Sequence, residues 1–249
     1  MSSNNARTAI VTGASKGLGA GIAKALAETG AAVVVNYRAD AQGAERVVAD
    51  ITAKGGRAIA VQADVAHGEE VRRLFDRARE AFGPVEVLVN NAAVAVFAPL
   101  SAITEDEFQR EMTTNLLGTI LTTQALAAQD DLETASIINV STAGTVTHPP
   151  YTSLYVASKS AVNAFTVVAA KELGPRGIRV NAIMPGPSDT EGTRAMGYAG
   201  SEREAQAIAA TPLGRTGTPD DYGPLVAFLA SDDARWITGD VILASGGMR

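Results

Sequence analysis

Seven short apolar runs, each bounded by turn residues, recur along the chain and constrain its fold more than any other feature. They are rich in Val and Ile and do not alternate apolar with polar residues, a pattern typical of strands buried on both faces of a parallel sheet. The runs are Thr8–Thr12, Ala31–Asn36, Arg57–Gln62, Val85–Asn90, Ser136–Val140, Ile178–Met184 and Asp240–Ala244.

Helical patterns lie between these runs. Residues 104–107 have the sequence of a capping box and predict the start of a long helix, and Thr218 followed by Pro219 predicts another. An apolar stripe at helical spacing consists of Val71, Leu74, Phe75, Ala78 and Phe82. Strands that alternate with helices predict an α/β fold, a doubly wound parallel sheet of the Rossmann type with about seven strands.

Composition excludes several classes of chemistry. The 249 residues include no Cys and only two His, His67 and His148, so we expect no thiol nucleophile, disulfide or metal site. A net charge of −6 argues against nucleic acid or an anionic membrane as partner. No stretch predicts a signal peptide or a transmembrane helix. We therefore expect residues 1–249 to form a single domain of a cytoplasmic protein.

Residues 186–215 interrupt the alternation of strand and helix. The segment is rich in Gly, Ser and charged residues, with a weak helical pattern near residues 201–210. An insertion of this size after a strand is usually a binding loop or a lid. We expect a small substrate lid at about residues 187–212, and the alternative is a solvated surface loop.

A glycine-rich turn follows the first predicted strand and precedes a helix. Its sequence is Thr12-Gly13-Ala14-Ser15-Lys16-Gly17-Leu18-Gly19. The glycines permit a tight turn, and the helix N-terminus offers free N–H groups to a pyrophosphate. The spacing differs from the standard G-x-G-x-x-G fingerprint, and such turns also serve only to pack a helix on a strand. Its position after the first strand of a βαβ unit favours a dinucleotide site.

The end of the second predicted strand indicates which dinucleotide binds. An NAD site usually carries an acid there, whereas an NADP site tends to carry an arginine. This chain has Asn36-Tyr37-Arg38, with no acid before Asp40. Because Arg38, aided by Lys16, can bind a 2′-phosphate, we expect NADP(H) as the preferred cofactor and NAD(H) as the alternative. The competing interpretation is that Arg38 is a solvated loop charge.

Tyr155 and Lys159 lie four residues apart in a predicted helix and therefore share one face. A phenol has a pKa near 10 and is a poor base at neutral pH. An ammonium about 4 Å away could lower that pKa by up to about three units. The pair can then donate and accept a proton near neutral pH, as general acid–base chemistry requires. In isolation, the same spacing usually means a surface tyrosine beside a lysine.

Several ordered motifs together resemble the short-chain dehydrogenase/reductase family over nearly the whole chain. The chain is most similar to the single-domain branch that holds 3-oxoacyl-carrier-protein reductases and glucose dehydrogenases. The motifs are the glycine turn at 12–19, Asn90-Asn91-Ala92-Ala93, Asn115, a Ser/Thr step after the fifth strand, Tyr155-x-x-x-Lys159, Asn181-x-x-x-Pro185-Gly186, Ile237-Thr238-Gly239 and Gly246-Gly247-Met248.

The resemblance implies roles for the matching residues. Tyr155 would be the general acid for carbonyl reduction and the base for alcohol oxidation, and Lys159 would lower its pKa and bind the nicotinamide ribose. Asn115 would hold a water that links Lys159 to solvent. Asp64-Val65 would contact adenine, Asn91 the adenosine ribose, and the 185–190 segment the nicotinamide. The predicted cofactor contacts are Gly13, Ser15, Lys16, Gly17, Leu18, Gly19, Tyr37, Arg38, Asp64, Val65, Asn91, Ala92, Tyr155, Lys159, Pro185, Gly186, Ser188 and Thr190.

Three positions depart from the family pattern. The carbonyl-binding serine expected 13 residues before the tyrosine falls on Thr142, and Ser141 lies 14 residues before it. Since consecutive strand residues point to opposite faces, only one of the two can act unless the strand has ended; the spacing favours Thr142. Ala93 replaces a glycine, and Pro187 with Ser188 stands where large apolar residues are usual.

These observations predict an NADP(H)-dependent enzyme that reduces a ketone or 3-oxoacyl carbonyl to a secondary alcohol, or catalyses the reverse reaction. The alternatives are a sugar or polyol dehydrogenase and, from another class, a catalytically idle NADP-binding regulator or scaffold. The expected partner is a small-molecule carbonyl or alcohol substrate. By resemblance, helices that begin near Thr104 and Ser153 would pair subunits into a homotetramer or homodimer.

Overall fold

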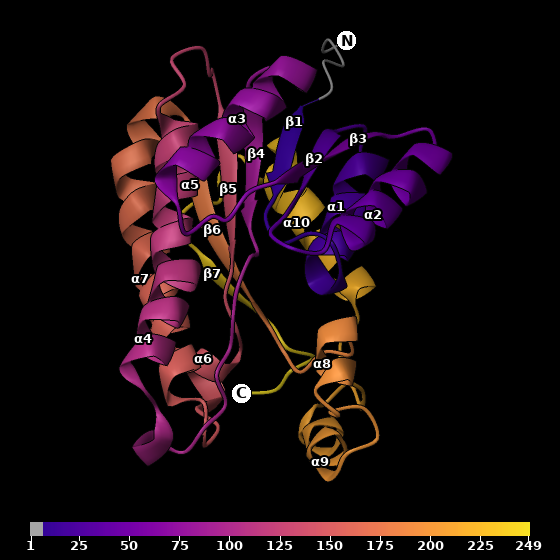
Figure 1. Ribbon diagram of the computed structural model, residues 1–249, viewed down its shortest axis with the longest axis vertical. Helices are drawn as coiled ribbons and strands as arrows, with labels where there is room; N and C mark the ends of the chain where they lie inside the picture. Colours follow the sequence, from indigo (N-terminus) through magenta and orange to yellow (C-terminus); the bar gives the residue numbers. More distant parts are fainter. Residues whose placement is uncertain (1–6) are drawn as a thin grey trace.

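One seven-stranded parallel sheet forms the centre of the computed structural model, which describes residues 7–249 (Figure 1). Its strand order is β3-β2-β1-β4-β5-β6-β7, so the predicted doubly wound sheet is confirmed. The strands are β1 Thr8–Val11, β2 Ala32–Tyr37, β3 Arg57–Gln62, β4 Val85–Asn90, β5 Ala135–Val140, β6 Ile178–Pro185 and β7 Val241–Ala244.

Burial differs between the inner and the edge strands. Inner strands such as β1 and β5 are buried throughout, as the apolar runs predict. The prediction of burial on both faces is wrong for β3 and β7, which are only partly buried. The reason is topological, because these two strands form the edges of the sheet.

Helices cover both faces of the sheet (Figure 1). One core contains Ala9 and Val11 of β1 and packs under α1, α2 and α10, and the other contains Ile10 and packs under α3, α5 and α7. Alternate residues of one strand therefore supply two separate cores. The bounds of these helices are α1 Gly17–Glu28, α2 Ala41–Ala53, α3 Gly68–Phe82, α5 Gly118–Ala127, α7 Ser153–Leu173 and α10 Pro219–Ala230.

The long helix predicted from Thr104 begins as expected but is not regular. Thr104 and Glu107 form the predicted capping box, with the Glu107 backbone N–H donating to the Thr104 hydroxyl at 3.2 Å. Helix α4 (Glu105–Met112) then passes through a π-helical turn, η2 (Thr113–Leu117), into α5. This turn is not visible in the sequence pattern, and it places Asn115 in the interior.

Shorter helices complete the chain. The lid segment contains α8 (Glu191–Ala195) and α9 (Glu202–Ala210), which lie beyond the carboxyl ends of the strands (Figure 1). Helix α9 confirms the weak pattern near 201–210, whereas the sequence does not predict α8. The other short helices are η1 Leu100–Ala102, α6 Gly144–Thr147, η3 Gly174–Arg176 and η4 Asp232–Ala234.

The strand order also determines where a ligand can bind. β1 lies between β2 and β4, so the chain leaves β1 toward one side of the sheet and later returns to the other. In open α/β sheets, ligands bind at the carboxyl ends of the strands beside such a switch point. Within residues 7–249, none of the helices has the length and apolar character needed to cross a membrane.

Candidate active site

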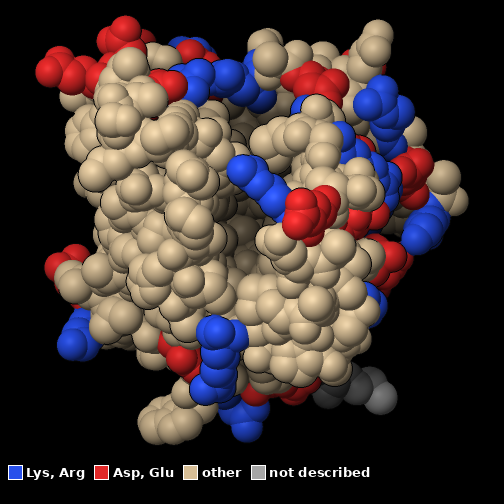
Figure 2. Space-filling model, turned by 90° about the horizontal axis from the view of Figure 1, so that it is seen from below, with Lys and Arg blue, Asp and Glu red and all other residues tan. Residues whose placement is uncertain are grey.

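A cavity of about 1200 Å³ opens at the carboxyl ends of the strands. Viewed from below, the molecule is hollowed there, and most of the rim is uncharged (Figure 2). The cavity brings together residues from the glycine turn, from the ends of β5 and β6, from α7 and from the lid. The predicted site residues that line it are Lys16, Leu18, Gly19, Asn91, Ser141, Thr142, Tyr155, Lys159, Pro185, Gly186, Ser188 and Thr190.

The glycine turn is packed so closely that larger side chains do not fit. Gly13 has a φ of 60° and Gly17 one of 59°, a backbone conformation that favours glycine. A Cβ on Gly19 would lie 2.5 Å from the Asn91 side-chain nitrogen. Asn91 donates from Nδ2 to the carbonyl of Thr12 at 2.8 Å and to that of Gly13 at 3.0 Å. Its side chain therefore ties β4 to the turn, which differs from the expected approach to a ribose.

Thr142 and Ser141 point in different directions. β5 ends at Val140, so the two residues lie in the loop beyond the strand. The Thr142 hydroxyl accepts a hydrogen bond from the backbone N–H of Gly144 at 3.1 Å, and Thr142 lies near enough to the phenol to lower the pKa of Tyr155. The Ser141 hydroxyl donates instead to the backbone carbonyl of Lys159 at 3.3 Å, and Ser141 is only 3% exposed. The geometry thus places Thr142, the residue favoured by spacing, beside the phenol.

Burial determines the protonation of the Tyr155–Lys159 pair. Burial raises the pKa of Tyr155 to about 12, the negative charge of Glu111 raises it further, and the Thr142 hydroxyl opposes the rise. Burial lowers the pKa of Lys159 to about 8, and Glu111 opposes that change. The expectation that Lys159 lowers the pKa of the phenol is therefore wrong for this arrangement. The Lys159 amine donates to the Val140 carbonyl at 2.7 Å, and the effect of burial on the phenol prevails.

The chain is similar to known proteins over nearly its whole length. A family model described as "Enoyl-(Acyl carrier protein) reductase" matches residues 13–249. An uncharacterized oxidoreductase of Methylorubrum extorquens is 53% identical over 249 residues, 100% of both chains. The chain belongs to the short-chain dehydrogenase/reductase family. It is an oxidoreductase of that family, as the motifs predict.

Two further members of the family extend the comparison. A protein named 3beta-hydroxysteroid dehydrogenase 1, from Eggerthella lenta, is 40% identical over 244 residues, which are 97% of this chain and 93% of that protein. A short-chain dehydrogenase from Burkholderia cenocepacia, solved in complex with NADP, is 38% identical. It superimposes with a TM-score of 0.90 over 98% of this chain and 97% of its own.

The other predicted site residues of this short-chain dehydrogenase do not line the cavity. They are Gly13, Ser15, Gly17, Tyr37, Arg38, Asp64, Val65, Ala92 and Asn115. Arg38 is exposed at the end of β2, and its guanidinium lies 3.7 Å from the carboxylate of Asp64. Asp64 also accepts a hydrogen bond from the backbone of Ala66 at 3.0 Å. Arg38 and Asp64 thus form an ion pair beside the switch point, which the sequence does not predict.

Asn36 is a site residue that sequence reasoning missed. It is buried at the end of β2, where its Oδ1 accepts from the backbone of Gly13 at 3.2 Å and its Nδ2 donates to the carbonyl of Ala63 at 3.0 Å. Asn36 thereby joins the glycine turn to the loop after β3. A polar residue at the end of the apolar run Val33–Val35 is the signal that could have identified it.

Asn115 uses its side chain to hold the loop after β4. Its Oδ1 accepts from the backbone N–H of Val94, and its Nδ2 donates to the Val94 carbonyl, both at 2.9 Å. Nδ2 also donates to the hydroxyl of Ser158 at 3.0 Å. These contacts use both N–H groups of the amide and one lone pair of its oxygen, so the predicted water has the second lone pair of Oδ1 to bind.

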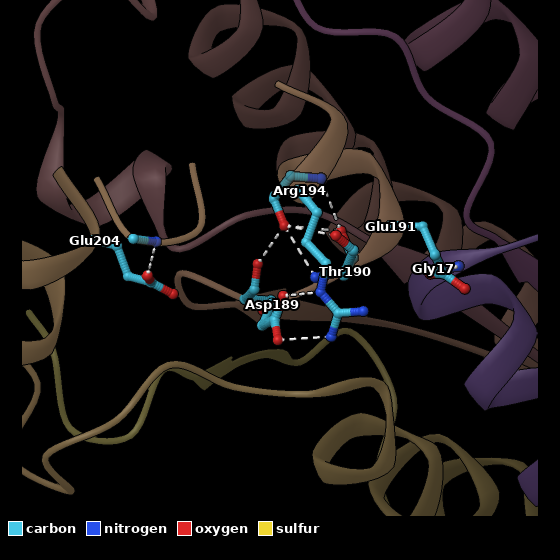
Figure 3. A network of polar contacts seen from close by, with 9 residues as sticks. Gly17, Asp189, Thr190, Glu191, Arg194 and Glu204 are labelled. Carbon is cyan, nitrogen blue, oxygen red and sulfur yellow. Dashed lines mark hydrogen bonds and ion pairs between the residues drawn. The ribbon is translucent and has the colours of Figure 1, made fainter. Parts of the chain in front are cut away.

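A network of polar contacts joins the lid to the glycine turn (Figure 3). A Glu191 carboxylate oxygen accepts a hydrogen bond from the backbone N–H of Gly17 at 2.9 Å, at the N-terminus of α1. Two residues away, Asp189 binds Arg194 through both carboxylate oxygens, at 2.6 and 2.7 Å. Glu191 therefore lies against the backbone where a pyrophosphate is expected, and the sequence gives no signal for this contact.

The predicted lid contacts Ser188 and Thr190 are engaged within the protein. The Ser188 hydroxyl lies 2.8 Å from the phenol oxygen of Tyr222 on α10, and Thr190 caps α8 in a capping box with Thr193. Five large side chains of the cavity lining were also missed by sequence reasoning. They are Phe97, Tyr151, Met196, Tyr198 and Met248. These residues lie in loops and in the lid, where no periodic pattern identifies a wall.

Proposed function

We propose that this oxidoreductase reduces a ketone to a secondary alcohol with NADP(H), and that it also catalyses the reverse reaction. The observation that carries the proposal is the convergence of Thr142, Tyr155 and Lys159 on one cavity that extends to the glycine turn. A proton donor, a hydroxyl that can bind a carbonyl oxygen and an ammonium then lie beside the place for a dinucleotide.

The residues of the turn fit a dinucleotide phosphate. Their close packing permits a near approach of a ligand to the backbone, and Lys16 on the cavity wall adds a positive charge. Pyrophosphate would lie along Lys16, Leu18 and Gly19, and a 2′-phosphate near Arg38. Asp40, the first acid after β2 in the sequence, caps α2 by accepting a hydrogen bond from the backbone of Gly43 at 2.9 Å. The NADP complex of the Burkholderia relative agrees with this choice, and NAD(H) remains the alternative.

The cofactor assignment is tested by the dissociation constants of NADPH and NADH for the wild type and Arg38→Ala. We expect a preference for NADPH that falls about tenfold or more in the variant, since a charge-assisted contact is lost. Arg72→Ala, which removes an exposed arginine on α3, is the control. An unchanged preference in Arg38→Ala would overturn the assignment of the 2′-phosphate to Arg38.

Residues of the chain itself donate the proton and stabilise the charge that remains. When bound, the nicotinamide supplies the hydride for reduction or accepts it in the reverse reaction. Because burial keeps the Tyr155 phenol protonated near neutral pH, this group can donate its proton to the carbonyl oxygen as the charge develops. The Thr142 hydroxyl lies beside the phenol and can donate to the same oxygen. The buried Lys159 amine, if protonated, stabilises the phenolate that remains.

We further propose that the substrate is a bulky apolar ketone. The cavity lining includes Phe97, Tyr151 and Met196, together with Tyr198 and Met248, and these side chains offer apolar and aromatic contact to a substrate. The hydroxysteroid named in the Eggerthella relative is a substrate of this shape. A polyol or a 3-oxoacyl thioester is the competing substrate class.

A substrate panel followed at the nicotinamide absorbance decides between these classes. It contains a ring ketone, a 3-oxoacyl thioester and a polyol, with both cofactors and with Tyr155→Phe as control. We expect the largest kcat/KM for the ring ketone. A higher value for the thioester or the polyol would reject the apolar class, and no turnover despite tight NADPH binding would favour an idle regulator.

We propose that the protein is a homotetramer, with a homodimer as the alternative. Apolar side chains are exposed on neighbouring helices, namely Phe108 on α4, Leu117 on η2 and Val168 on α7. Light scattering at micromolar protein should give a multimeric mass, and a monomeric mass would reject the proposal. The single domain, the closing lid at 187–212 and the cytoplasmic location remain predictions, which proteolysis and cell fractionation test.

A further inference from the structure

Glu111 is a buried carboxylate that the proposed proton transfer does not use. It lies in the last turn of α4 and is 0% exposed. One carboxylate oxygen accepts a hydrogen bond from the backbone N–H of Val96 at 3.1 Å. The other is buried and has no hydrogen-bond partner in residues 7–249. A buried polar group of this kind costs stability and calls for a functional explanation.

Glu111 and Asn115 together hold one loop by its backbone. They are four residues apart and share a face of the helix that runs from α4 into η2. Asn115 binds both polar backbone atoms of Val94, and Glu111 binds the next inward-facing N–H, that of Val96. The loop at residues 91–99 carries no titratable side chain, so its position depends on these backbone contacts.

The clamped loop contacts the proton donor directly. Phe97 follows Val96, and its ring meets the ring of Tyr155 edge-on, with 5.9 Å between centroids and an interplanar angle of 77°. Edge-on pairs of this kind are a favourable aromatic arrangement. The neighbouring Ala98 also donates from its backbone to the carbonyl of Tyr151 at 3.0 Å. The backbone bond of Glu111 therefore determines where an aromatic wall lies against the phenol.

The charge of Glu111 acts on the same site. It raises the pKa of both Tyr155 and Lys159, which lie on α7. Burial raises the pKa of Glu111 itself, the bond from Val96 opposes this, and the other charges that act on it are those of Arg110, Lys159 and Glu107. An ionised Glu111 thus disfavours the phenolate and favours the ammonium.

We propose that Glu111 is a positioning residue for proton transfer, which holds the Phe97 wall against Tyr155 and keeps the phenol protonated. Removal of the charge alone should make the phenol easier to ionise. Removal of the hydrogen bond as well should also move the wall. The inference rests on the proposed function of Tyr155 as the proton donor.

The test separates charge from position. Glu111→Gln keeps an oxygen acceptor for Val96 but no charge, whereas Glu111→Leu removes both. The rate of NADPH-dependent reduction of the best ketone is measured from pH 6 to 10, a range that includes the pKa of about 8 of Lys159, which Glu111 also raises. The values of kcat and KM are determined separately. For Glu111→Gln we expect the basic limb of the kcat profile to move down by about one pH unit, with little change at the optimum. For Glu111→Leu we expect a further fall in kcat of about tenfold or more, with the NADPH dissociation constant unchanged.

Two controls keep the outcomes distinct. Glu105→Gln changes an exposed carboxylate on the same helix and should leave the profile unchanged. The NMR shift of the labelled Tyr155 ring, assigned from the spectrum of Tyr155→Phe, should follow the same displacement in Glu111→Gln. A kcat profile and a tyrosine titration of Glu111→Gln that superimpose on the wild type overturn the inference, even if Glu111→Leu does not fold. Full activity of Tyr155→Phe would instead overturn the proposed function.

Discussion

The helical region formed by α4, η2 and α7, called the wall below, differs from the lid in how its polar groups are held. In the wall, Glu111, Asn115 and Lys159 are at most 3% exposed and bind backbone atoms. In the lid, neither α8 nor α9 has a buried residue, and the Asp189–Arg194 ion pair is largely exposed. Exposed ion pairs contribute about 0–1 kcal/mol, whereas an unpaired buried polar group costs more. The wall is thus built for fixed geometry, and the lid for low-cost rearrangement.

The largest effect should come from the wall. Tyr155→Phe removes the hydroxyl that is proposed to deliver the proton, so we expect kcat to fall about 10³-fold. The dissociation constant of NADPH should change by less than about threefold, because the ring and its packing on Phe97 remain. Steady-state kinetics and NADPH fluorescence measure the two quantities. A variant that retains a tenth of the activity would show that another group delivers the proton.

The second effect distinguishes two neighbours in the loop after β5, beside the wall. Thr142→Val removes the hydroxyl that lies near the Tyr155 phenol and should lower kcat about 10²-fold. Ser141→Ala removes a hydroxyl that binds only the backbone of Lys159, so a loss below about tenfold is expected. Steady-state kinetics give kcat for the two variants. A larger loss of kcat in Ser141→Ala than in Thr142→Val would assign the carbonyl contact to Ser141.

A smaller effect should come from the lid. Glu191→Gln keeps an acceptor for Gly17 but removes a negative charge from the turn that is proposed to bind pyrophosphate. We expect NADPH to bind about two- to fivefold more tightly, with less gain at high salt because screening weakens the repulsion. Glu204→Gln is the matched control, since Glu204 accepts a backbone hydrogen bond from Gly200 within the lid at 2.6 Å (Figure 3). Weaker binding in Glu191→Gln would mean that the contact closes the lid over the cofactor.

The smallest effect concerns the point where the lid segment meets α10. Asp221 binds Arg215 and accepts a hydrogen bond from the backbone of Thr218 at 2.7 Å. These contacts hold the pKa of the Asp221 carboxyl well below its usual range, the Arg215 bond contributing most. Asp221→Asn should cost about 1 kcal/mol of unfolding free energy at neutral pH.

The pH dependence of that loss provides its control. Because the folded pKa of Asp221 is depressed, its stabilisation is present above the unfolded pKa of about 4 and is lost as the pH falls toward the folded value. Thermal unfolding of wild type and Asp221→Asn should therefore differ most at pH 7, and the difference should begin to shrink only as the pH falls below about 4. A difference that is the same at pH 7 and at the lowest pH where the protein still folds would mean that the variant changes packing rather than this charge.

Much of the fold was predictable because it depends on local pattern. Val- and Ile-rich runs predict buried strands, and the Thr104 and Thr218 caps place two helix starts correctly. The edge strands β3 and β7 could not be distinguished from inner strands, because edge position depends on pairing across the whole sheet. The π-helical turn at Asn115 has no periodic signature, since it arises from packing against the loop after β4.

The candidate site also has a part that the sequence predicts and a part that depends on the tertiary structure. Tyr155, Lys159 and the glycine turn were predictable because their motifs are short and their chemistry depends on residue type. The direction of the Tyr155 pKa shift was not, because it depends on burial, which is a tertiary property. Glu111 and Glu191 gave no signal, since each acts through a partner more than ten residues away, Val96 in one case and Gly17 in the other.

The sequence by itself determined the order of strands and helices, the turn suited to a phosphate and the family, and it predicts Tyr155 as the proton donor, because each depends on short motifs and local patterns. Only the tertiary structure decided which hydroxyl lies beside the phenol, what keeps the phenol protonated and what touches the turn. These depend on burial and on contacts between distant segments, which set the local dielectric and the direction of each side chain.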